Sequence, residues 1–210
     1  MEKEIPLLSA QEQRVLGTLI EKSKTTPDYY PMTVNALTAG CNQKTSRRPV
    51  VDYDEETVLA TLNSLKGQGL ATTAIGGGSR VTKHKHNFSI RYTLSDAEEA
   101  ILCLLLLRGP QTAGELNTNS GRLHEFSSLE SVLETLHGLG NAETPFVKEL
   151  IRKPGQKEQR YTHLFGESYD QDEAPITDST PKVSVTDLEA RVTVLEQELA
   201  ELKNKLSGLL

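Results

Sequence analysis

Two groups of basic side chains are the residues in this sequence whose types and spacing could bind an anion. One lies in the segment 40–54, GCNQKTSRRPVVDYD, and the other in the segment 79–92, SRVTKHKHNFSIRY, where no acidic residue interrupts the cations. Lysine and arginine contact the phosphates of nucleic acids without reading their sequence. The residues predicted to contact double-stranded DNA in this way are Lys44, Ser46, Arg47, Arg48, Arg80, Lys83, Lys85, His86 and Arg91.

The loop arginines also have a structural interpretation. Arg47 and Arg48 could pair with the neighbouring Asp52, Asp54 or Glu55 and merely hold the loop in place, because exposed ion pairs of this kind are common. The sequence leaves both interpretations open.

Metal binding and catalysis have weaker support. His84 and His86 could share one face of a strand, but no cysteine or further histidine stands at a spacing that would complete a zinc site. His124, His137 and His163 are isolated. No phosphate-binding loop, dinucleotide fingerprint, nucleophile elbow or His-Glu-x-x-His motif is present. The sequence therefore predicts a protein that is not an enzyme and that has no metal and no cofactor.

An internal repeat supplies the elements that carry these residues. The stretch 57–71, TVLATLNSLKGQGLA, recurs at 131–142 as SVLETLHGLGNA. Each copy places its apolar residues on one stripe of a helix. After each helix the chain turns at glycine and enters a basic segment ending in Tyr-Thr, at Tyr92-Thr93 and Tyr161-Thr162, which predicts a hairpin in both copies. The two stripes are Val58, Leu59, Leu62 and Leu65, and Val132, Leu133, Leu136 and Leu139.

The repeat extends upstream of these helices. Ser9 with Glu12, and Ser95 with Glu98, have the spacing of a capping box, which predicts that a helix begins at each. Short second helices are expected over 32–39 and 111–117, with Val34, Leu37, Ala113 and Leu116 facing inward. Three helices followed by a two-stranded wing is the order of a winged helix-turn-helix. The expected fold is mainly α with small β wings, in two tandem winged-helix domains over 1–93 and 94–165.

The rest of the chain has a different composition. Residues 166–182 are acidic and contain few large apolar side chains, which predicts a flexible linker. Residues 183–210 form a heptad pattern that predicts a two-stranded coiled coil and a homodimer; the alternative is a helix that folds back onto its own domains. The predicted dimerisation residues are Val185, Leu188, Val192, Leu195, Leu199, Leu202 and Leu206, with Leu209 completing the d positions.

Charge differs between these regions. The net charge of −6 lies in residues 166–210, because residues 1–165 contain 19 basic and 19 acidic side chains. Residues 1–94 contain 12 basic and 9 acidic side chains, so a polyanion should meet the first domain. The longest apolar run, 100–107, is shorter than the roughly 20 residues of a membrane span. With reduced Cys41 and Cys103, the expectation is a soluble cytoplasmic protein without membrane contact.

The segment 41–51, CNQKTSRRPVV, is the part of the sequence that most closely resembles a known protein family. With the preceding YPMTVNALTAG and the following EETVL, it resembles the YceH-like family of uncharacterised bacterial proteins. The resemblance covers about residues 8–165 and leaves the tail outside. It implies two winged-helix domains in tandem and an architecture like that of DNA-binding proteins, and it implies no particular activity.

Two functions follow as hypotheses. The first is a non-enzymatic DNA-binding or transcription-regulator-like protein that contacts phosphates through the 44–48 loop and the first wing. However, Glu55 and Glu56 begin the third helix of the first repeat, and Glu130 and Glu134 lie on its counterpart, where acids would face phosphates. The alternative is therefore a protein-interaction adaptor, similar to the tandem winged helices of bacterial chromosome-segregation complexes.

Overall fold

The computed structural model describes residues 5–74, 81–152 and 155–166, and these belong to one compact unit, Met1–Tyr169. Several predicted features lie outside the described residues. They are Arg80, the glycine tip at 76–78, most of the acidic segment, and the heptad residues Val185, Leu188, Val192, Leu195, Leu199, Leu202 and Leu206.

Both predicted capping boxes are present, and each begins the first helix of its repeat. At the start of α1 (Ala10–Thr25), the Ser9 hydroxyl accepts the Glu12 N–H at 3.2 Å, and the Glu12 carboxylate accepts the Ser9 N–H at 2.8 Å. Ser95 and Glu98 repeat this pattern at 3.3 and 2.8 Å before α5 (Asp96–Arg108). These bonds satisfy N–H groups that have no partner within the helix.

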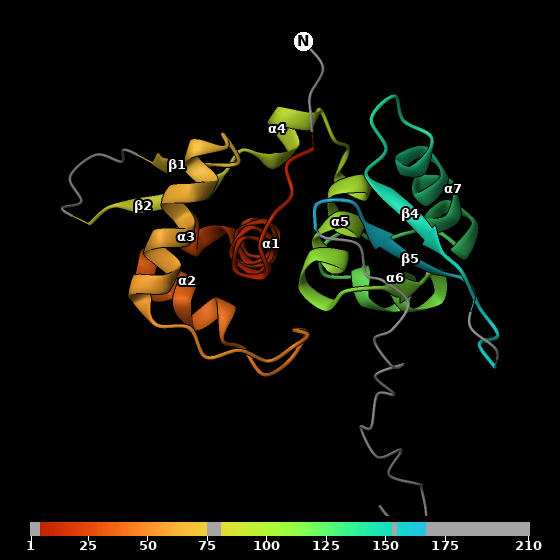
Figure 1. Ribbon diagram of the computed structural model, residues 1–210, viewed down its shortest axis with the longest axis horizontal. Coiled ribbons are helices and arrows are strands. Elements are labelled where there is room, and N and C mark those ends of the chain that lie inside the picture. Colours follow the sequence, from red (N-terminus) through yellow and green to blue (C-terminus); the bar gives the residue numbers. More distant parts are fainter. Residues whose placement is uncertain (1–4, 75–80, 153–154, 167–210) are drawn as a thin grey trace, which may run out of the picture. The chain divides into compact units, whose positions relative to one another are not determined.

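The two halves of the unit have the same order of elements, helices first and then a hairpin, and small antiparallel sheets accompany the helices (Figure 1). In the first half α1 is followed by a short 3-10 turn (Pro27–Tyr29), α2 (Val34–Cys41), α3 (Glu55–Gly67), β1 (Ala71–Ala74) and β2 (Lys83–His86). A short helix, α4 (Phe88–Tyr92), leads to the second half. There α5 is followed by β3 (Gln111–Thr112), α6 (Ala113–Ser120), α7 (Leu129–Gly140), β4 (Val147–Leu150) and β5 (Arg160–His163).

Strand pairing shows which residues of the two halves correspond. In the first half β1 pairs with β2, and Met32 forms an isolated bridge to His84. In the second half β4 pairs with β5, and Gln111 of β3 pairs with Tyr161. Met32 and Gln111 each stand one residue before the threonine that caps the next helix. His84 is therefore the counterpart of Tyr161.

This register corrects the predicted alignment of the two Tyr-Thr pairs. The returning arm of the first hairpin ends at His86, and the chain then forms α4 instead of continuing as a strand to Tyr92. Phe88 and Tyr92 lie four residues apart on one face of this helix and are both buried. Burial of these two rings accounts for a helix at this place.

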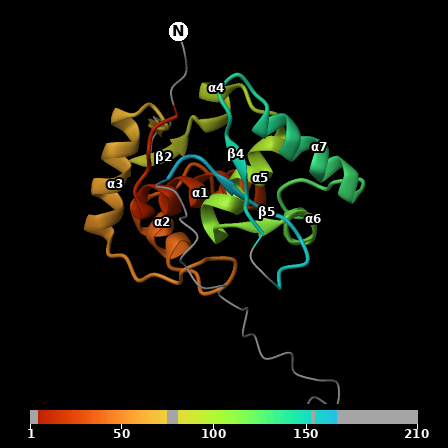
Figure 2. The same cartoon turned by 45° about the vertical axis from the view of Figure 1, so that its right-hand side comes forward.

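A single hydrophobic core joins the two halves, because α1 and α5 lie side by side (Figure 2). Every residue of α5 from Ala100 to Leu107 is buried, so its own half covers only part of its apolar surface. Gly17 of α1 lies so close to α5 that a Cβ there would stand 2.9 Å from the side chain of Leu107. The predicted boundary at residue 93 separates two repeats that share this core.

The stripes of the third helices are confirmed at three positions of four. Val58, Leu62 and Leu65 of α3 are buried, and so are their counterparts Val132, Leu136 and Leu139 of α7. The fourth position is wrong in both copies, because Leu59 is 43% exposed and Leu133 is 41% exposed. A residue next to the buried valine lies about 100° around the helix and leaves the inward face.

Within residues 5–74, 81–152 and 155–166, none of the helices combines the length and apolarity that a membrane span requires.

Candidate functional site

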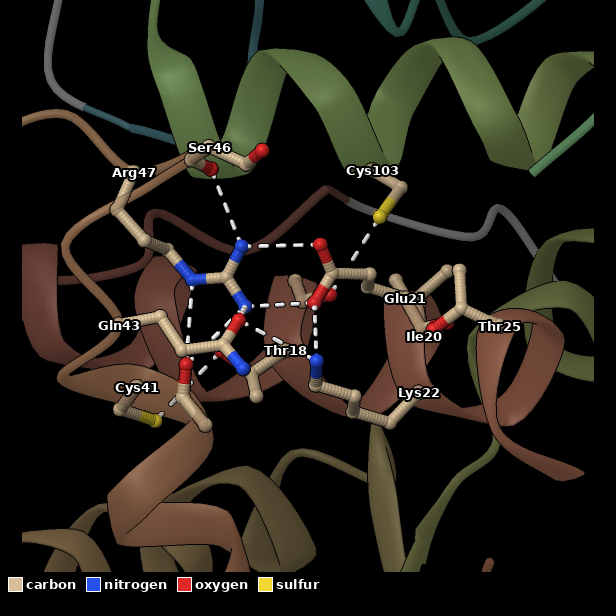
Figure 3. A network of polar contacts seen from close by, with 12 residues as sticks. Thr18, Ile20, Glu21, Lys22, Thr25, Cys41, Gln43, Ser46, Arg47 and Cys103 are labelled. Carbon is tan, nitrogen blue, oxygen red and sulfur yellow. Dashed lines mark hydrogen bonds and ion pairs between the residues drawn. The ribbon is translucent and has the colours of Figure 1, made fainter. Parts of the chain in front are cut away.

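Arg47, at the centre of the basic loop, is buried with 3% of its surface exposed. Its Nη2 atom lies 2.6 Å from Glu21 Oε2 and its Nη1 atom lies 3.0 Å from Glu21 Oε1, which is a two-pronged ion pair with α1 (Figure 3). Its Nε and Nη2 atoms also donate to the Gly40 carbonyl at 3.2 and 3.1 Å. The guanidinium is thus fully occupied inside the protein.

The prediction that Arg47 contacts a phosphate is therefore wrong in this conformation. The structural interpretation holds instead, but the acid is Glu21 on α1, not one of the acids within the loop. Burial by itself would raise the pKa of Glu21; the hydrogen bond and the charge of Arg47, with help from Lys22, more than offset this and lower it.

The other loop residues are also bonded internally. The Asn42 side chain donates to the Tyr53 carbonyl at 2.8 Å and accepts the Tyr53 N–H at 2.9 Å, which closes the two ends of the loop. Buried Arg14 of α1 donates to the carbonyls of Cys41 and Pro49. These contacts satisfy backbone groups that would otherwise lack partners.

The same loop reaches the second half of the unit. The Arg48 N–H donates to the Leu107 carbonyl at 2.9 Å, and Arg108 Nη2 donates to the Ser46 hydroxyl at 2.9 Å. Ser46 adopts a φ of 60°, a left-handed conformation that is uncommon for serine. The unusual length of the segment between α2 and α3 thus has a structural reason, because the loop spans from one repeat to the end of α5 in the other.

Alternate residues of β2 have opposite environments. Lys85 is exposed and Lys83 is half-buried, whereas His84 between them is 2% exposed. Burial lowers the pKa of His84, and the charge of Lys66 lowers it further. Period-two alternation therefore leaves the two lysines as the accessible cations of this strand.

His86 faces the interior, so its predicted contact with a phosphate is also wrong. Its Nε2 atom lies 3.1 Å from the Ser23 hydroxyl and its Nδ1 atom lies 3.7 Å from the carboxylate of buried Glu99. Burial lowers the pKa of His86 and the charge of Glu99 opposes that shift. Lys24 Nζ is 2.9 Å from Glu99 and 2.6 Å from Asp96, so this polar group joins α1 to α5. In the described ranges, no three histidine, cysteine or acidic residues converge as a metal site would require.

Arg91 stands on α4 instead of on a strand. Its guanidinium carbon lies 5.5 Å from the centre of the Tyr92 ring, a cation–π distance. Of the nine predicted phosphate contacts, Lys44 and Lys85 are exposed, Lys83 and Arg48 are half-buried, and Ser46 and Arg91 have partners within the protein.

A cavity that sequence reasoning missed lies beside the Arg47–Glu21 pair. Its volume is about 570 Å³, and it lies between the loop and the C-terminal ends of α1, α5 and α6. Four cations line it: Lys22, Lys44, Arg108 and Arg122. Two of these, Arg108 and Arg122, come from the second half, where acidic side chains outnumber basic ones and the sequence gave no signal of a cationic site. Side chains far apart in sequence converge only in the folded chain.

A second cavity, of about 700 Å³, lies between α7 and the sheet of the second half. Its walls are largely apolar and include Leu133, Pro145, Val147, Tyr161 and Leu164. The exposed leucine of α7 is thus part of a concave surface.

Comparisons with known proteins agree over most of the chain. Residues 8–156 match the family described as "Protein of unknown function, DUF480". A UPF0502 protein of Shewanella halifaxensis is 46% identical over 211 residues, covering 97% of this chain and 98% of its own. The UPF0502 protein YceH of Salmonella paratyphi B is 44% identical over 208 residues, covering 97% and 96%. A UPF0502 protein of Opitutus terrae is 46% identical over 200 residues, covering 95% and 84%.

Proposed function

The chain belongs to the DUF480 family, whose bacterial members include UPF0502 proteins such as YceH, and from this premise we propose a non-enzymatic, cytoplasmic tandem winged-helix protein that acts as a protein-interaction adaptor. The repeated order of three helices and a hairpin supports the winged-helix part of the proposal. The matching contacts of Met32 with His84 and of Gln111 with Tyr161 support it further. In both halves, the residue before the capping threonine of the second helix pairs with the returning strand of the hairpin.

The observation that carries the adaptor function is the similar exposure of Leu59 and Leu133. They occupy the same position of the repeat, beside the buried stripes of α3 and α7, and Leu133 also lines the cavity between α7 and its sheet. A winged helix that reads DNA usually presents cations on this helix, but here exposed Glu55 and Glu130 stand near the helix starts. Leucine flanked by acids suits a partner segment with apolar side chains and neighbouring lysine or arginine.

Three residues predicted to contact DNA make contacts within the protein instead, which also favours the adaptor over DNA binding. Arg47 and His86 face the interior, and Arg91 stacks beside Tyr92. Fewer accessible cations mean fewer neutralised phosphates, and affinity for DNA falls with each one lost.

Affinity capture tests the adaptor with a matched control. The tagged full-length chain is used beside the double variant Leu59→Ser/Leu133→Ser, and beside Ile151→Ser, which removes an apolar side chain that is 73% exposed elsewhere. We expect a stoichiometric partner that survives nuclease treatment, is retained by Ile151→Ser and is reduced at least tenfold by the double variant. Equal retention by the double variant, or no stoichiometric partner, would refute the adaptor.

DNA binding through the first hairpin is the second candidate, because Lys85 is exposed and Lys83 is half-exposed on the same strand. A gel shift at low salt with the double variant Lys83→Gln/Lys85→Gln tests it. Binding to any duplex that weakens with both the substitutions and added salt would favour this candidate. No shift with any duplex at low salt would remove it.

The heptad pattern of residues 183–210 supports a homodimer as part of the proposal. Mass measurement in solution, with and without these residues, tests this. Loss of the dimer on truncation is expected, and a truncated chain that still dimerises would exclude the heptad segment as the cause.

A further inference from the structure

We propose that the cavity beside the Arg47–Glu21 pair binds a small phosphorylated ligand of nucleotide size. Its lining residues come from the ends of three helices and the 43–46 loop, so both repeats contribute to it. A volume of about 570 Å³ falls within the range of roughly 300–1,000 Å³ that is usual for small-molecule sites.

The cations in this cavity exceed what its own acid neutralises. Glu21 lies 2.6 Å from Arg47 Nη2 and 3.3 Å from Lys22 Nζ, so its charge is already balanced. Lys44 and Arg122 are exposed, and among the described residues neither has an ion pair at 4 Å or less. The two side chains come from opposite repeats and line the same cavity, which offers an anion two cations that are not paired with Glu21, the acid in the lining.

Helix dipoles offer an alternative reason for cations here, because α1, α5 and α6 end at the cavity. Each C-terminus is equivalent to roughly −0.5 charge, so three ends contribute about −1.5. The lining carries Lys22, Lys44, Arg108 and Arg122, and its one acid, Glu21, is paired with buried Arg47. The dipoles therefore offset only part of the charge of the lining cations, and the remaining positive charge suits a phosphate group.

Polar and apolar groups in the lining narrow the ligand class. The Thr45 hydroxyl and the Gln43 amide nitrogen line the cavity and can donate hydrogen bonds to phosphate or sugar oxygens. Figure 3 shows Lys22 of α1 beside Gln43 and Ser46 of the loop, and Lys22 Nζ donates to the Gln43 amide oxygen at 3.2 Å. Leu104, Leu107 and Leu123 add an apolar part to the wall. Cations beside an apolar wall suit a phosphate attached to a ring.

A small ligand fits this arrangement better than a DNA duplex does. The cations surround a cavity between two repeats, whereas a duplex backbone presents a line of phosphates that requires an open row of contacts. The inference is independent of the adaptor function, because its residues lie away from Leu59 and Leu133.

Calorimetric titration of the full-length chain at low salt tests the proposal, with inorganic pyrophosphate and ADP as separate probes. The double variant Lys44→Gln/Arg122→Gln removes the two exposed cations, and both side chains are on the surface, so the fold should persist. The matched control Lys85→Gln/Lys157→Gln removes the same charge from exposed positions outside the cavity. We expect saturable one-to-one binding that the cavity variant weakens at least tenfold and the control changes no more than twofold.

Three results would overturn the proposal. The first is that neither probe shows saturable binding. The second is that the control and the cavity variant weaken binding equally. The third is that binding is unaltered in a cavity variant whose circular dichroism and unfolding midpoint match the wild type. If pyrophosphate binds and ADP does not bind more tightly, the site recognises phosphate alone, and the proposed contact of a ring with the apolar wall is wrong. If the first of these three results is found together with binding of a 12-base-pair duplex through Lys44 and Arg122, the two cations belong to a DNA contact.

Discussion

Phe88 and Phe165 pack against each other across the two repeats, with ring centroids 5.2 Å apart and planes inclined by 56°. Each ring stands two residues beyond the last residue of its hairpin, after His86 in the first repeat and after His163 in the second. Tyr92 and Phe146 complete the cluster at centroid distances of 5.3 to 5.9 Å from their neighbours. Equivalent residues of a duplicated unit thus form one of the contacts that join its copies.

Phe165→Ala should lower the free energy of unfolding by about 3–5 kcal/mol, because it removes a fully buried ring from this cluster. Urea denaturation measures the loss. Combining it with Phe88→Ala should reveal a coupling of about 0.5–1.5 kcal/mol beyond the two single effects. Strict additivity would show that the two rings do not stabilise each other.

Arg47→Met should destabilise the protein by about 3 kcal/mol or more, because it leaves Glu21 without its main partner. Adding Glu21→Gln should restore part of the loss, since no uncompensated charge then remains. Lys44→Met in the same loop is the control and should change stability by no more than about 0.5 kcal/mol. A similar effect of the two methionine substitutions would contradict the buried ion pair as a stabilising contact.

Gly17→Val should destabilise by about 1–3 kcal/mol, because its side chain would enter the space occupied by Leu107. Gly138→Ala on α7 is the opposite case, since nothing lies within 4 Å of a Cβ at that position. This alanine should stabilise the protein by about 0.5–1 kcal/mol. Thermal unfolding compares the two variants, and the same direction of change in both would contradict the close approach of α1 and α5.

His163 should make the protein less stable in acid. Burial lowers its pKa from 6.5 to about 4, so between these values the unfolded chain binds a proton that the folded chain does not. The stability associated with neutral His163 is complete above pH 6.5 and falls as the pH drops toward 4, by about 3 kcal/mol in total.

Denaturation at several pH values tests this linkage with His163→Gln. The variant should lose less stability than the wild type between pH 6.5 and 4.5, whereas His137→Gln, at an exposed position on α7, should follow the wild type. Parallel curves for the wild type and His163→Gln would show that His163 does not carry the acid sensitivity.

Local signals in the sequence were sufficient for most helices. Ser9 and Ser95 begin their helices as predicted, since a capping box depends only on residues three apart. Three buried positions in each of α3 and α7 followed from the helical period, whereas Leu59 and Leu133, predicted in the same stripes, lie about 100° from the buried valines and are exposed. The end of the first hairpin was missed because burial of Phe88 and Tyr92 depends on a distant ring, Phe165.

The candidate site was less predictable. The basic character of the 44–48 loop was evident, but the acid that neutralises Arg47 lies 26 residues earlier, on α1. Lys44 and Arg122 meet at one cavity although their numbers in the chain differ by 78. Spacing along the chain contains no information about either relationship.

The sequence by itself determined the duplicated order of helices and hairpins, because caps, turns and periodicity act between neighbouring residues. Only the tertiary structure decided which charged side chains are buried and which are exposed. A cation turns inward when a carboxylate and carbonyl groups offset its lost hydration, as Glu21 and Gly40 do for Arg47, and it stays at the surface when no such partners are in reach. Those partners come together only when α1, the loop and α5 pack into one core.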